Sequence, residues 1–414
     1  MEELLLFHIP ETSPVYRFYK AYKKNPWDES AMSLAVRDLI DMGYRKGFIG
    51  KNLWQLALTE HLVTCENAFS LSCEVRKEGG EGSVRDIALK DAAILRKLYT
   101  LDLVGDSSSL FALRSFDDSM SARNAEYGHT IRNAMGELSK KLSKAISDEA
   151  FLDMLTAFYK KYGVGMLGLH KAFRLDKEGM ITPIGSILHV SLDDLIGYEW
   201  QKELLIENTE AFLKGRPANN CLLYGDAGTG KSTSIKAILH KYYGEGLRMI
   251  EIYKHEFKYL NNIINIVKNR NYRFIIFMDD LSFDDFEVEY KYLKAVIEGG
   301  LEKKPDNILI YATSNRRHLI KESFKDKEGY DDLHKTDTVQ EKLSLSARFG
   351  VNIYFGSPDK KEFENMVLIM KEQAGIQISD DELLLKANQW EIRHGGLSGR
   401  TARQFIDYLS GTLA

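Results

Sequence analysis

A glycine-rich segment near the middle of the chain carries a lysine and a serine at fixed spacing from its glycines. An apolar run from Cys221 to Tyr224, the length of a short buried strand, precedes it, and residues 234–240 follow with helical spacing. Strand, glycine loop and helix are the context that the pattern G-x-x-x-x-G-K-[ST] requires. The residues that fit the pattern are Gly225, Asp226, Ala227, Gly228, Thr229, Gly230, Lys231 and Ser232, with Thr233 directly after them.

The residue types in this segment suit an anionic ligand. Glycines have no Cβ, so successive backbone N–H groups can surround closely spaced phosphate oxygens. A helix that begins near Lys231 directs the positive end of its dipole at the same place. Lys231 adds a full charge for the β- and γ-phosphates, and Ser232 offers a hydroxyl ligand to Mg²⁺. The segment therefore predicts a site for ATP and Mg²⁺, whereas a chance glycine turn is disfavoured by the flanking strand and helix.

Length and composition set the wider limits. A chain of 414 residues predicts two or three domains, and 44% apolar with 28% charged residues is typical of soluble globular proteins. The net charge of −4 gives no electrostatic basis for nucleic-acid binding by the whole molecule. No window of eighteen apolar residues occurs, so we expect no membrane span. The odd cysteine count and the acidic N-terminus, which lacks a signal peptide, predict reduced thiols and a cytoplasmic location.

Apolar runs alternate with helical patterns after the glycine loop. This alternation predicts a parallel sheet covered by helices on both faces, a fold in which ligands collect at the carboxyl ends of the strands. The strands are expected at 221–224, 247–253, 274–278, 308–313 and 351–355, and the helices between them at 257–268 and 290–299.

Polar residues follow two of these strands. Asp279 and Asp280 end the third strand, and Asn315 ends the fourth. Beside a phosphate loop, Asp279 is the expected partner of magnesium, Asp280 is placed to orient or deprotonate an attacking water, and Asn315 to help position that water. The alternative is that these residues only form turns or cap helices.

Arginines near the end of the chain complete the candidate set. Arg348, just before the last strand, is expected at the edge of the domain, where it can reach a neighbouring subunit's nucleotide; Arg316 and Arg317 are its rivals, and a surface ion pair is the alternative. Helices predicted at 361–373, 380–389 and 398–409 form a small lid. Arg400, with Arg403 as second choice, is placed to fold over the phosphates.

The first half of the chain shows no catalytic motif. Apolar spacing predicts helices at 30–42, 53–62, 84–103, 131–146 and 149–162. The Tyr- and Lys-rich segment 16–24 is interpreted as a solvated helix face, with a nucleic-acid surface as the alternative. Residues 173–192 resemble a connector. After it, Ile196 and Gly197 either line an adenine pocket or only pack in a linker.

These motifs together resemble the AAA+ ATPase module over roughly residues 190–414. Four segments, Gly215–Asn220, Asp279–Phe283, Ala312–Leu319 and Ser398–Phe405, resemble an uncharacterised AAA+ family known as domain of unknown function 815. The resemblance implies ATP binding and hydrolysis and no particular substrate. The chain departs from most AAA+ modules in one respect, because Asp280 stands where they have glutamate, and a side chain one methylene shorter predicts slow hydrolysis. A polar insert at 322–341 is interpreted as a tolerated loop or a partner contact.

The sequence therefore predicts an α/β P-loop AAA+ module with a five-stranded parallel sheet, a helical lid and a mainly helical N-terminal domain. The expected domains are 1–175 for partner recognition, 176–356 for nucleotide binding and 357–414 for the lid. The predicted activity is ATP hydrolysis by a homo-oligomer, a ring or subunit pairs, that remodels or loads a protein or nucleic-acid client. A nucleotide-switched loader, for instance of a DNA helicase, and a P-loop kinase are the alternatives.

Overall fold

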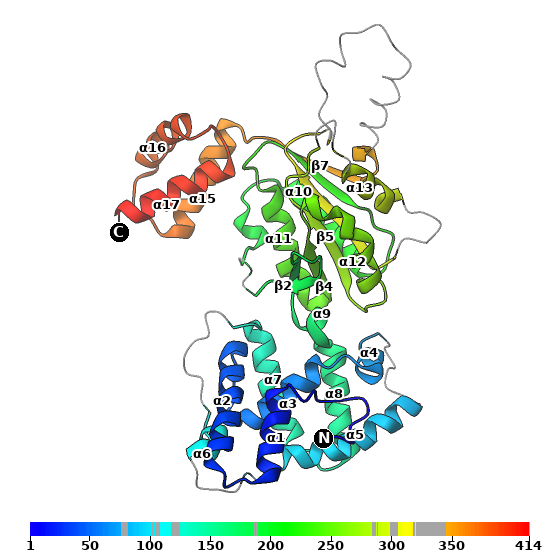
Figure 1. The fold of residues 1–414 in the computed structure, drawn as a ribbon. Helices are drawn as coiled ribbons and strands as arrows, with labels where there is room; N and C mark the ends of the chain where they lie inside the picture. The colour runs from blue at the N-terminus through cyan, green and yellow to red at the C-terminus, as the bar shows by residue number, and fades with distance from the viewer. Residues whose placement is uncertain are drawn as a thin grey trace. The chain divides into compact units, whose positions relative to one another are not determined.

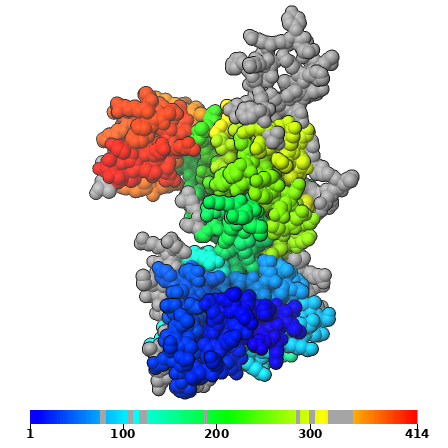
Figure 2. All heavy atoms as spheres, in the orientation of Figure 1, coloured from blue at the N-terminus to red at the C-terminus, as the bar shows by residue number. Residues whose placement is uncertain are grey.

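The chain divides into two compact units, residues 1–171 with 183–187 (the helical unit) and residues 172–182 with 188–414 (the sheet unit). Figure 1 traces both units, and Figure 2 draws their atoms, coloured from blue to green along the helical unit and from green to red along the sheet unit. The computed structural model describes residues 1–75, 82–101, 103, 108–116, 125–185, 187, 189–283, 287, 289–298, 305–317, 319 and 345–413. Every helix in these ranges is too short or too polar to span a lipid bilayer.

Helices make up the helical unit, as the apolar spacing predicts. Polar side chains cap several of them, for example Ser13, Asp28 and Ser147, each of which accepts a backbone N–H of the first turn. The predicted helix 84–103 ends earlier, at Tyr99. The helices are α1 (Pro14–Lys24), α2 (Glu29–Lys46), α3 (Leu53–Thr64), α4 (Ala68–Val75), α5 (Ser83–Tyr99), α6 (Ser108–Arg114), α7 (His129–Leu142), α8 (Asp148–Tyr162) and α9 (Gly165–Leu169).

Helix α3 lies at the centre of this unit, because most of its residues are buried and they are distributed around the helix. A helix without a polar face is stable only when other helices surround it. Its Trp54 is 1% exposed and donates its indole N–H to the carbonyl of Leu98 at 2.8 Å. The hydroxyl groups of Thr59 and Tyr99 lie 2.7 Å apart in the same core. Trp54 and Thr59 of α3 are thus paired with partners on α5.

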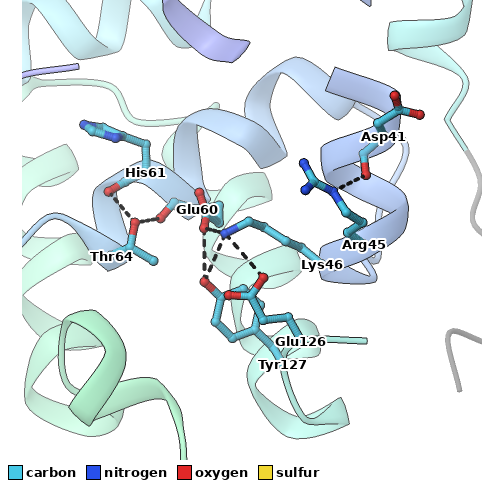
Figure 3. A network of polar contacts seen from close by, with 8 residues as sticks. All are labelled: Asp41, Arg45, Lys46, Glu60, His61, Thr64, Glu126 and Tyr127. Atoms are coloured by element: carbon cyan, nitrogen blue, oxygen red, sulfur yellow. Dashed lines mark hydrogen bonds and ion pairs between the residues drawn. The ribbon is translucent and has the colours of Figure 1, made fainter. Parts of the chain in front are cut away.

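A buried ion pair joins α2, α3 and the start of α7 (Figure 3). The ammonium of Lys46 contacts the carboxylate of Glu60, which is 6% exposed. The hydroxyl of Tyr127 donates to the same carboxylate at 3.0 Å, and Glu126 lies 3.8 Å from Lys46. Burial raises the pKa of Tyr127 well above its ordinary value, with the Glu60 charge acting in the same direction. The cluster holds its charges in place and satisfies them internally.

The carboxylate of Asp91 on α5 holds the beginning of the chain. It accepts backbone N–H groups from three successive residues, Leu5, Leu6 and Phe7, at 2.8–3.1 Å. Asp91 is fully buried, so these hydrogen bonds replace the water that its charge would otherwise require.

A seven-stranded sheet organises the sheet unit. The strand order is β2-β1-β4-β5-β6-β3-β7, and every strand pair with a described register is parallel. Strands β3 to β7 therefore bring their carboxyl ends to one edge. Their bounds are β3 (Cys221–Gly225), β4 (Leu247–Glu251), β5 (Arg273–Met278), β6 (Ile308–Ser314) and β7 (Val351–Phe355). None of the cysteines, Cys65, Cys73 or Cys221, forms a disulfide.

Helices between the strands flank the sheet, which confirms the α/β fold class (Figure 1). The predicted helix 257–268 is divided into a 3-10 turn, Lys254–Tyr259, and a shorter α-helix. The flanking helices are α10 (Glu199–Leu213), α11 (Lys231–Tyr242), α12 (Leu260–Val267) and α13 (Glu289–Glu298).

The sheet has seven strands, so the sequence prediction of five strands is wrong. Strands β1 (Ala172–Leu175) and β2 (Ile181–Pro183) lie in the segment predicted to be a connector. Ala172 pairs with Met249, so β1 extends the sheet beyond β4. Both strands are too short for a clear alternation of apolar and polar residues, and the charged turn between them dominates the sequence pattern.

The lid, coloured orange to red in Figures 1 and 2, has an apolar core of its own. Phe363, Leu383 and Phe405 are central members of that core, each from a different helix. Asp359 caps the first helix and Ser379 the second, each by accepting a backbone N–H. The lid helices are α15 (Lys360–Ala374), α16 (Asp380–Arg393) and α17 (Gly399–Leu413).

Candidate nucleotide-binding site

The glycine loop connects β3 to α11 at the carboxyl edge of the sheet. Gly225, Gly228 and Gly230 have positive φ angles of 132°, 78° and 94°, which side chains with a Cβ rarely adopt. A Cβ on Gly225 would lie 2.1 Å from the carbonyl oxygen of Phe355, and one on Gly230 would lie 2.1 Å from a methyl of Leu195. Positions 225 and 230 of the loop are therefore restricted to glycine. Two residues of the motif, Asp226 and Ala227, are exposed. Thr233, which directly follows the motif, is half-buried.

Lys231, the first residue of α11, is 6% exposed. Its ammonium donates to the backbone oxygens of Gly225 and Asp226 at 2.9 and 2.6 Å and to the amide oxygen of Asn315 at 3.1 Å. All three acceptors are neutral. Burial lowers the pKa of Lys231, and the carboxylates of Asp226 and Asp280 oppose that shift. The arrangement positions a cation beside a helix N-terminus and bare backbone, which favours an anion.

Ser232 and Asp279 come together although they are 47 residues apart. The hydroxyl of Ser232 donates to Oδ1 of Asp279 at 2.5 Å, and the hydroxyl of Thr313 donates to the same oxygen at 2.6 Å. Both residues of the predicted metal site thus meet at the end of β5. A hydroxyl and a carboxylate are oxygen ligands of the kind that Mg²⁺ prefers.

Asp280 turns away from Asp279 because its backbone is left-handed, with φ of +50°. Its N–H donates to the hydroxyl of Thr313 at 2.9 Å, and its carboxylate accepts the side-chain amide of Asn315 at 2.8 Å. A left-handed aspartate is uncommon, and strained residues of this kind cluster at functional sites. The two aspartates consequently face different partners, Asp279 the serine and Asp280 the asparagine.

The acidic residue of the loop, Asp226, contacts the residues that lead to the lid. Its carboxylate accepts the backbone N–H and the hydroxyl of Ser357 at 2.8 and 3.0 Å. Its own N–H donates to Phe355 at 2.9 Å, while Thr229 donates its hydroxyl to the carbonyl of Asp226 at 2.8 Å. The negative charge of Asp226 is thereby held at the lid side of the loop.

The start of α17 also contacts the loop. The backbone N–H of Arg400 donates to the carbonyl of Gly228 at 3.1 Å, and a Cβ on Gly228 would lie 3.0 Å from the hydroxyl of Ser398. The Arg400 side chain is exposed, and its charge contributes to the lowered pKa of Lys231. Arg400 is therefore near the loop, whereas Arg403 lies about one turn farther along α17 and is exposed.

Ile196 and Gly197 lie between the loop and the lid core. Ile196 and Tyr198 pack against that core, and Gly197 approaches Met366. Tyr198 has a positive φ of 61° and donates its hydroxyl to the carbonyl of Gly356 at 2.8 Å. Burial raises its pKa to about 12. The packing interpretation of this segment has direct contacts in its favour, and the adenine pocket stays a prediction.

Other predicted residues are not brought to Lys231. Arg348 precedes β7, at the amino edge of the sheet, whereas the glycine loop follows the carboxyl end of the neighbouring β3. Four residue steps, about 13 Å of strand, separate the two edges. Arg316 and Arg317 follow Asn315 directly and are exposed. The insert 322–341 lies outside the described residues.

Three contacting residues were not identified from the sequence as part of the site. Thr313 touches both aspartates, Ser357 binds Asp226, and Leu195 packs on Gly230. Only Thr313 left a sequence signal, because it is a hydroxyl residue near the end of an apolar strand and close to Asn315. The other two belong to segments with no catalytic pattern.

Comparison with solved structures found RuvB proteins of Thermotoga maritima. Two substituted forms are 17% identical with TM-scores of 0.38, and cover 55% of this chain and 67% and 69% of theirs. The RuvB Holliday junction branch migration motor is 14% identical with a TM-score of 0.32, and covers 53% of this chain and 72% of its own. None of the curated proteins matches the chain.

The profile of a protein family matches a long segment of the chain. The family is described as a protein of unknown function, DUF815, and the match spans residues 168–413. That segment includes the glycine loop, both aspartates and the lid, and it is more than half of the 414 residues. The resemblance indicated by the sequence motifs is confirmed, and the chain belongs to the DUF815 family.

Proposed function

We propose that this protein is an AAA+ ATPase that binds and hydrolyses Mg-ATP. One observation carries the proposal, the convergence of Lys231, Ser232, Asp279 and Asn315 at the carboxyl edge of the sheet. These residues come from three separate strand ends, and each has a different chemical capacity. A cation, a hydroxyl, a carboxylate and an amide at the end of a glycine loop suit phosphoryl transfer.

The residues fit both ATP and magnesium. A Cβ at Gly225 or Gly230 would collide with Phe355 or Leu195, so both positions of the loop are restricted to glycine. Residues 225–233 hold the triphosphate, Lys231 neutralises part of its charge, and Arg400 extends from the lid towards it. Ser232 and Asp279 hold magnesium, which when bound neutralises charge on the phosphate oxygens. Ile196 and Gly197 are proposed beside the adenine.

Asp280 and Asn315 carry the chemistry of hydrolysis. The carboxylate of Asp280 accepts the proton of the attacking water, and the amide of Asn315 orients that water. Their hydrogen bond of 2.8 Å fixes one carboxylate oxygen and leaves the other for the water. Because Asp280 is shorter than the glutamate of most AAA+ modules, we expect turnover at the slow end of the common enzyme range, about 1 per second.

Work on a macromolecular client requires more than one subunit in this proposal. Arg348, at the opposite edge of the sheet from its own loop, supplies charge to the nucleotide of a neighbour in a ring or pair of subunits. Contacts from Arg400 and Ser357 link the loop to the lid, so occupancy of the loop changes the position of the lid. The helical domain, proposed as residues 1–175, recognises a protein or nucleic-acid client.

The nucleotide assignment is tested by the substitution Lys231→Ala. Loss of one charge-assisted contact, about 1.5–3 kcal/mol, weakens ATP binding about tenfold to a hundredfold and abolishes turnover. Lys241→Ala on the exposed end of the same helix is the matched control and keeps both. The measurements are calorimetric ATP affinity and phosphate release, with circular dichroism to check folding. Equal affinity in Lys231→Ala and Lys241→Ala disproves the proposal.

The client class is tested by stimulation of phosphate release. Single-stranded DNA that raises the rate identifies a loader of a nucleic-acid machine, whereas an unfolded protein that raises it identifies a remodeller. The net charge of −4 gives no preference for nucleic acid, so we expect stimulation by protein.

A further inference from the structure

We infer that Thr313 is a positioning residue that keeps the metal-binding and the water-activating carboxylates apart. The inference rests on the proposed ATP hydrolysis and adds a residue to its site. The hydroxyl of Thr313 donates to Asp279 at 2.6 Å and accepts the backbone N–H of Asp280 at 2.9 Å. One side chain therefore touches both aspartates, and it uses its single proton on the first and a lone pair on the second.

The sheet places Thr313 beside this pair of residues. Met278 pairs with Ala312 in the register of β5 and β6, so the next residues, Asp279 and Thr313, follow side by side. Thr313 is 2% exposed and β-branched, which leaves it few rotamers. Its backbone carbonyl also accepts the N–H of Leu281 at 2.7 Å. Thr313 thus holds three successive residues, 279–281, at a fixed place.

The left-handed backbone of Asp280 explains why such a clamp is needed. A non-glycine residue at φ of +50° is strained, and strain of about 1–3 kcal/mol persists only when neighbours fix the conformation. The hydrogen bond from its N–H to Thr313 is a direct restraint on that peptide. If the peptide relaxes, Asp280 no longer faces Asn315, and its short side chain has little reach with which to compensate.

The proton that Thr313 donates also acts on Asp279. Oδ1 of that carboxylate accepts from Thr313 and from Ser232 at once. The Thr313 hydroxyl is buried in the sheet, so it fixes the orientation of the carboxylate while Oδ2 stays available. Removal of the hydroxyl is therefore expected to weaken magnesium binding and water activation together, and to leave the phosphate contacts of Lys231 unchanged.

The experiment uses Thr313→Val, which keeps the shape, and Thr313→Ser, which keeps the hydroxyl. For Thr313→Val, we expect kcat to fall about 10- to 100-fold, the size of one or two hydrogen bonds to charged or strained groups. Calorimetric affinity for ATP in EDTA stays within twofold of wild type, but the gain in affinity on adding Mg²⁺ shrinks. Thr313→Ser recovers most of both losses.

Thr209→Val is the matched control, because it removes another buried hydroxyl, which donates to the carbonyl of Leu205 at 2.7 Å. Thr209→Val is expected to lower the melting temperature and to leave the Mg²⁺-dependent gain in ATP affinity unchanged. The inference is overturned if Thr313→Val keeps the gain and a kcat within twofold of wild type, or if Thr313→Ser is no better than Thr313→Val. Failure of Thr313→Val and Thr313→Ala to fold, where Thr209→Val folds, also overturns it in favour of a structural role.

Failure of the proposed function gives a different result. If wild-type protein binds Mg-ATP without releasing phosphate, hydrolysis is disproved. The role of Thr313 is then tested only by the Mg²⁺-dependent gain in ATP affinity. If wild-type protein shows no Mg²⁺-dependent gain in affinity, both the metal site and the inference are wrong.

Discussion

Two lysines, Lys46 in the helical unit and Lys231 in the sheet unit, are both largely buried. Their ammonium groups contact different kinds of partner. Lys46 contacts the carboxylate of Glu60, with Glu126 nearby (Figure 3). Among the described residues, Lys231 donates to neutral oxygens, those of Gly225, Asp226 and Asn315. The charge of Lys46 is balanced inside the protein, whereas that of Lys231 is hydrogen-bonded but not balanced by a directly contacting carboxylate.

The difference supports the proposal that Lys46 is a structural lysine and Lys231 a binding one. Removing one partner of a buried ion pair leaves an isolated charge and destabilises the fold. A buried cation surrounded by neutral acceptors has the opposite property, because its charge is fully compensated only when an anion arrives. Both lysines are largely buried, so we base the proposed distinction between them on the charge of their partners.

The prediction with the largest expected effect is that ATP hydrolysis at Lys231 needs a further positive charge from a neighbouring subunit. Arg348→Ala and Lys231→Ala are each expected to be inactive, because a trans arginine contributes about 10³–10⁵ in rate. When the two variants are mixed, activity returns as protein concentration rises, since one subunit supplies the arginine and the other the lysine. Phosphate release across a concentration series measures this recovery.

Arg316→Ala and Arg317→Ala serve as comparisons, because both arginines are exposed near Asn315. Normal turnover by Arg348→Ala, or no recovery despite co-assembly shown by sedimentation, would eliminate Arg348 as the trans residue. The same mixing experiment then applies to the two comparison variants.

The prediction with the next largest effect separates ATP binding from ATP hydrolysis at the carboxyl edge of the sheet. Asp280→Asn keeps the size of the side chain and loses the base, so turnover is expected to fall about 10²–10⁴-fold. ATP affinity should stay near wild type because Lys231 is unchanged. Single-turnover kinetics with radiolabelled ATP measure both quantities, and turnover within twofold of wild type would show that Asp280 is not the base.

The two lysines can be compared directly by the same substitution. Lys46→Met leaves the carboxylate of Glu60 without its cation and is expected to lower the free energy of unfolding by about 1–3 kcal/mol, somewhat less than for a fully buried pair. ATP affinity should not change. Lys231→Met is expected to have the reverse profile, weak ATP binding with stability retained. Urea unfolding and calorimetry on both variants test the comparison, and equal profiles would refute it.

The smallest effect is the pH dependence of stability. Burial lowers the pKa of Lys231, so between its folded pKa and its ordinary pKa the unfolded chain binds more protons than the folded one. Stability of the wild type relative to Lys231→Met therefore rises with pH in that alkaline window and is lowest below it. Urea unfolding from pH 7 to 10 checks the sign, and a difference that falls with rising pH contradicts it.

Much of the site could be predicted because it depends on local patterns and on one rule of parallel sheets. The glycine loop needs only a strand, a motif and a helix in sequence. Contact between Ser232, after β3, and Asp279, after β5, follows because the carboxyl ends of parallel strands share one edge of the sheet, although β6 lies between these two strands. The chemical roles of Asp280, Asn315, Arg348 and Arg400 stay predictions.

The rest depends on contacts that no local pattern encodes. Ser357 binds Asp226 from 131 residues away, and neither residue type signals the other. The left-handed backbone of Asp280 is held by a hydrogen bond from its N–H to Thr313 of β6, a contact that its own sequence neighbours do not indicate. Strands β1 and β2 escaped prediction for a similar reason, because pairing of β1 with β4 and of β2 with β1 stabilises segments that have little strand character alone.

The carboxylate of Asp91 also has a consequence for how the helical unit folds and opens. Its bonds to residues 5–7 close loops of 84–86 residues without a covalent link. The entropy cost of closure rises with the logarithm of loop length, so these contacts should form after the local helices. The same three amides should then exchange with solvent deuterium when residues 5–7 detach from the Asp91 carboxylate. Their protection therefore measures how firmly this segment is held against α5.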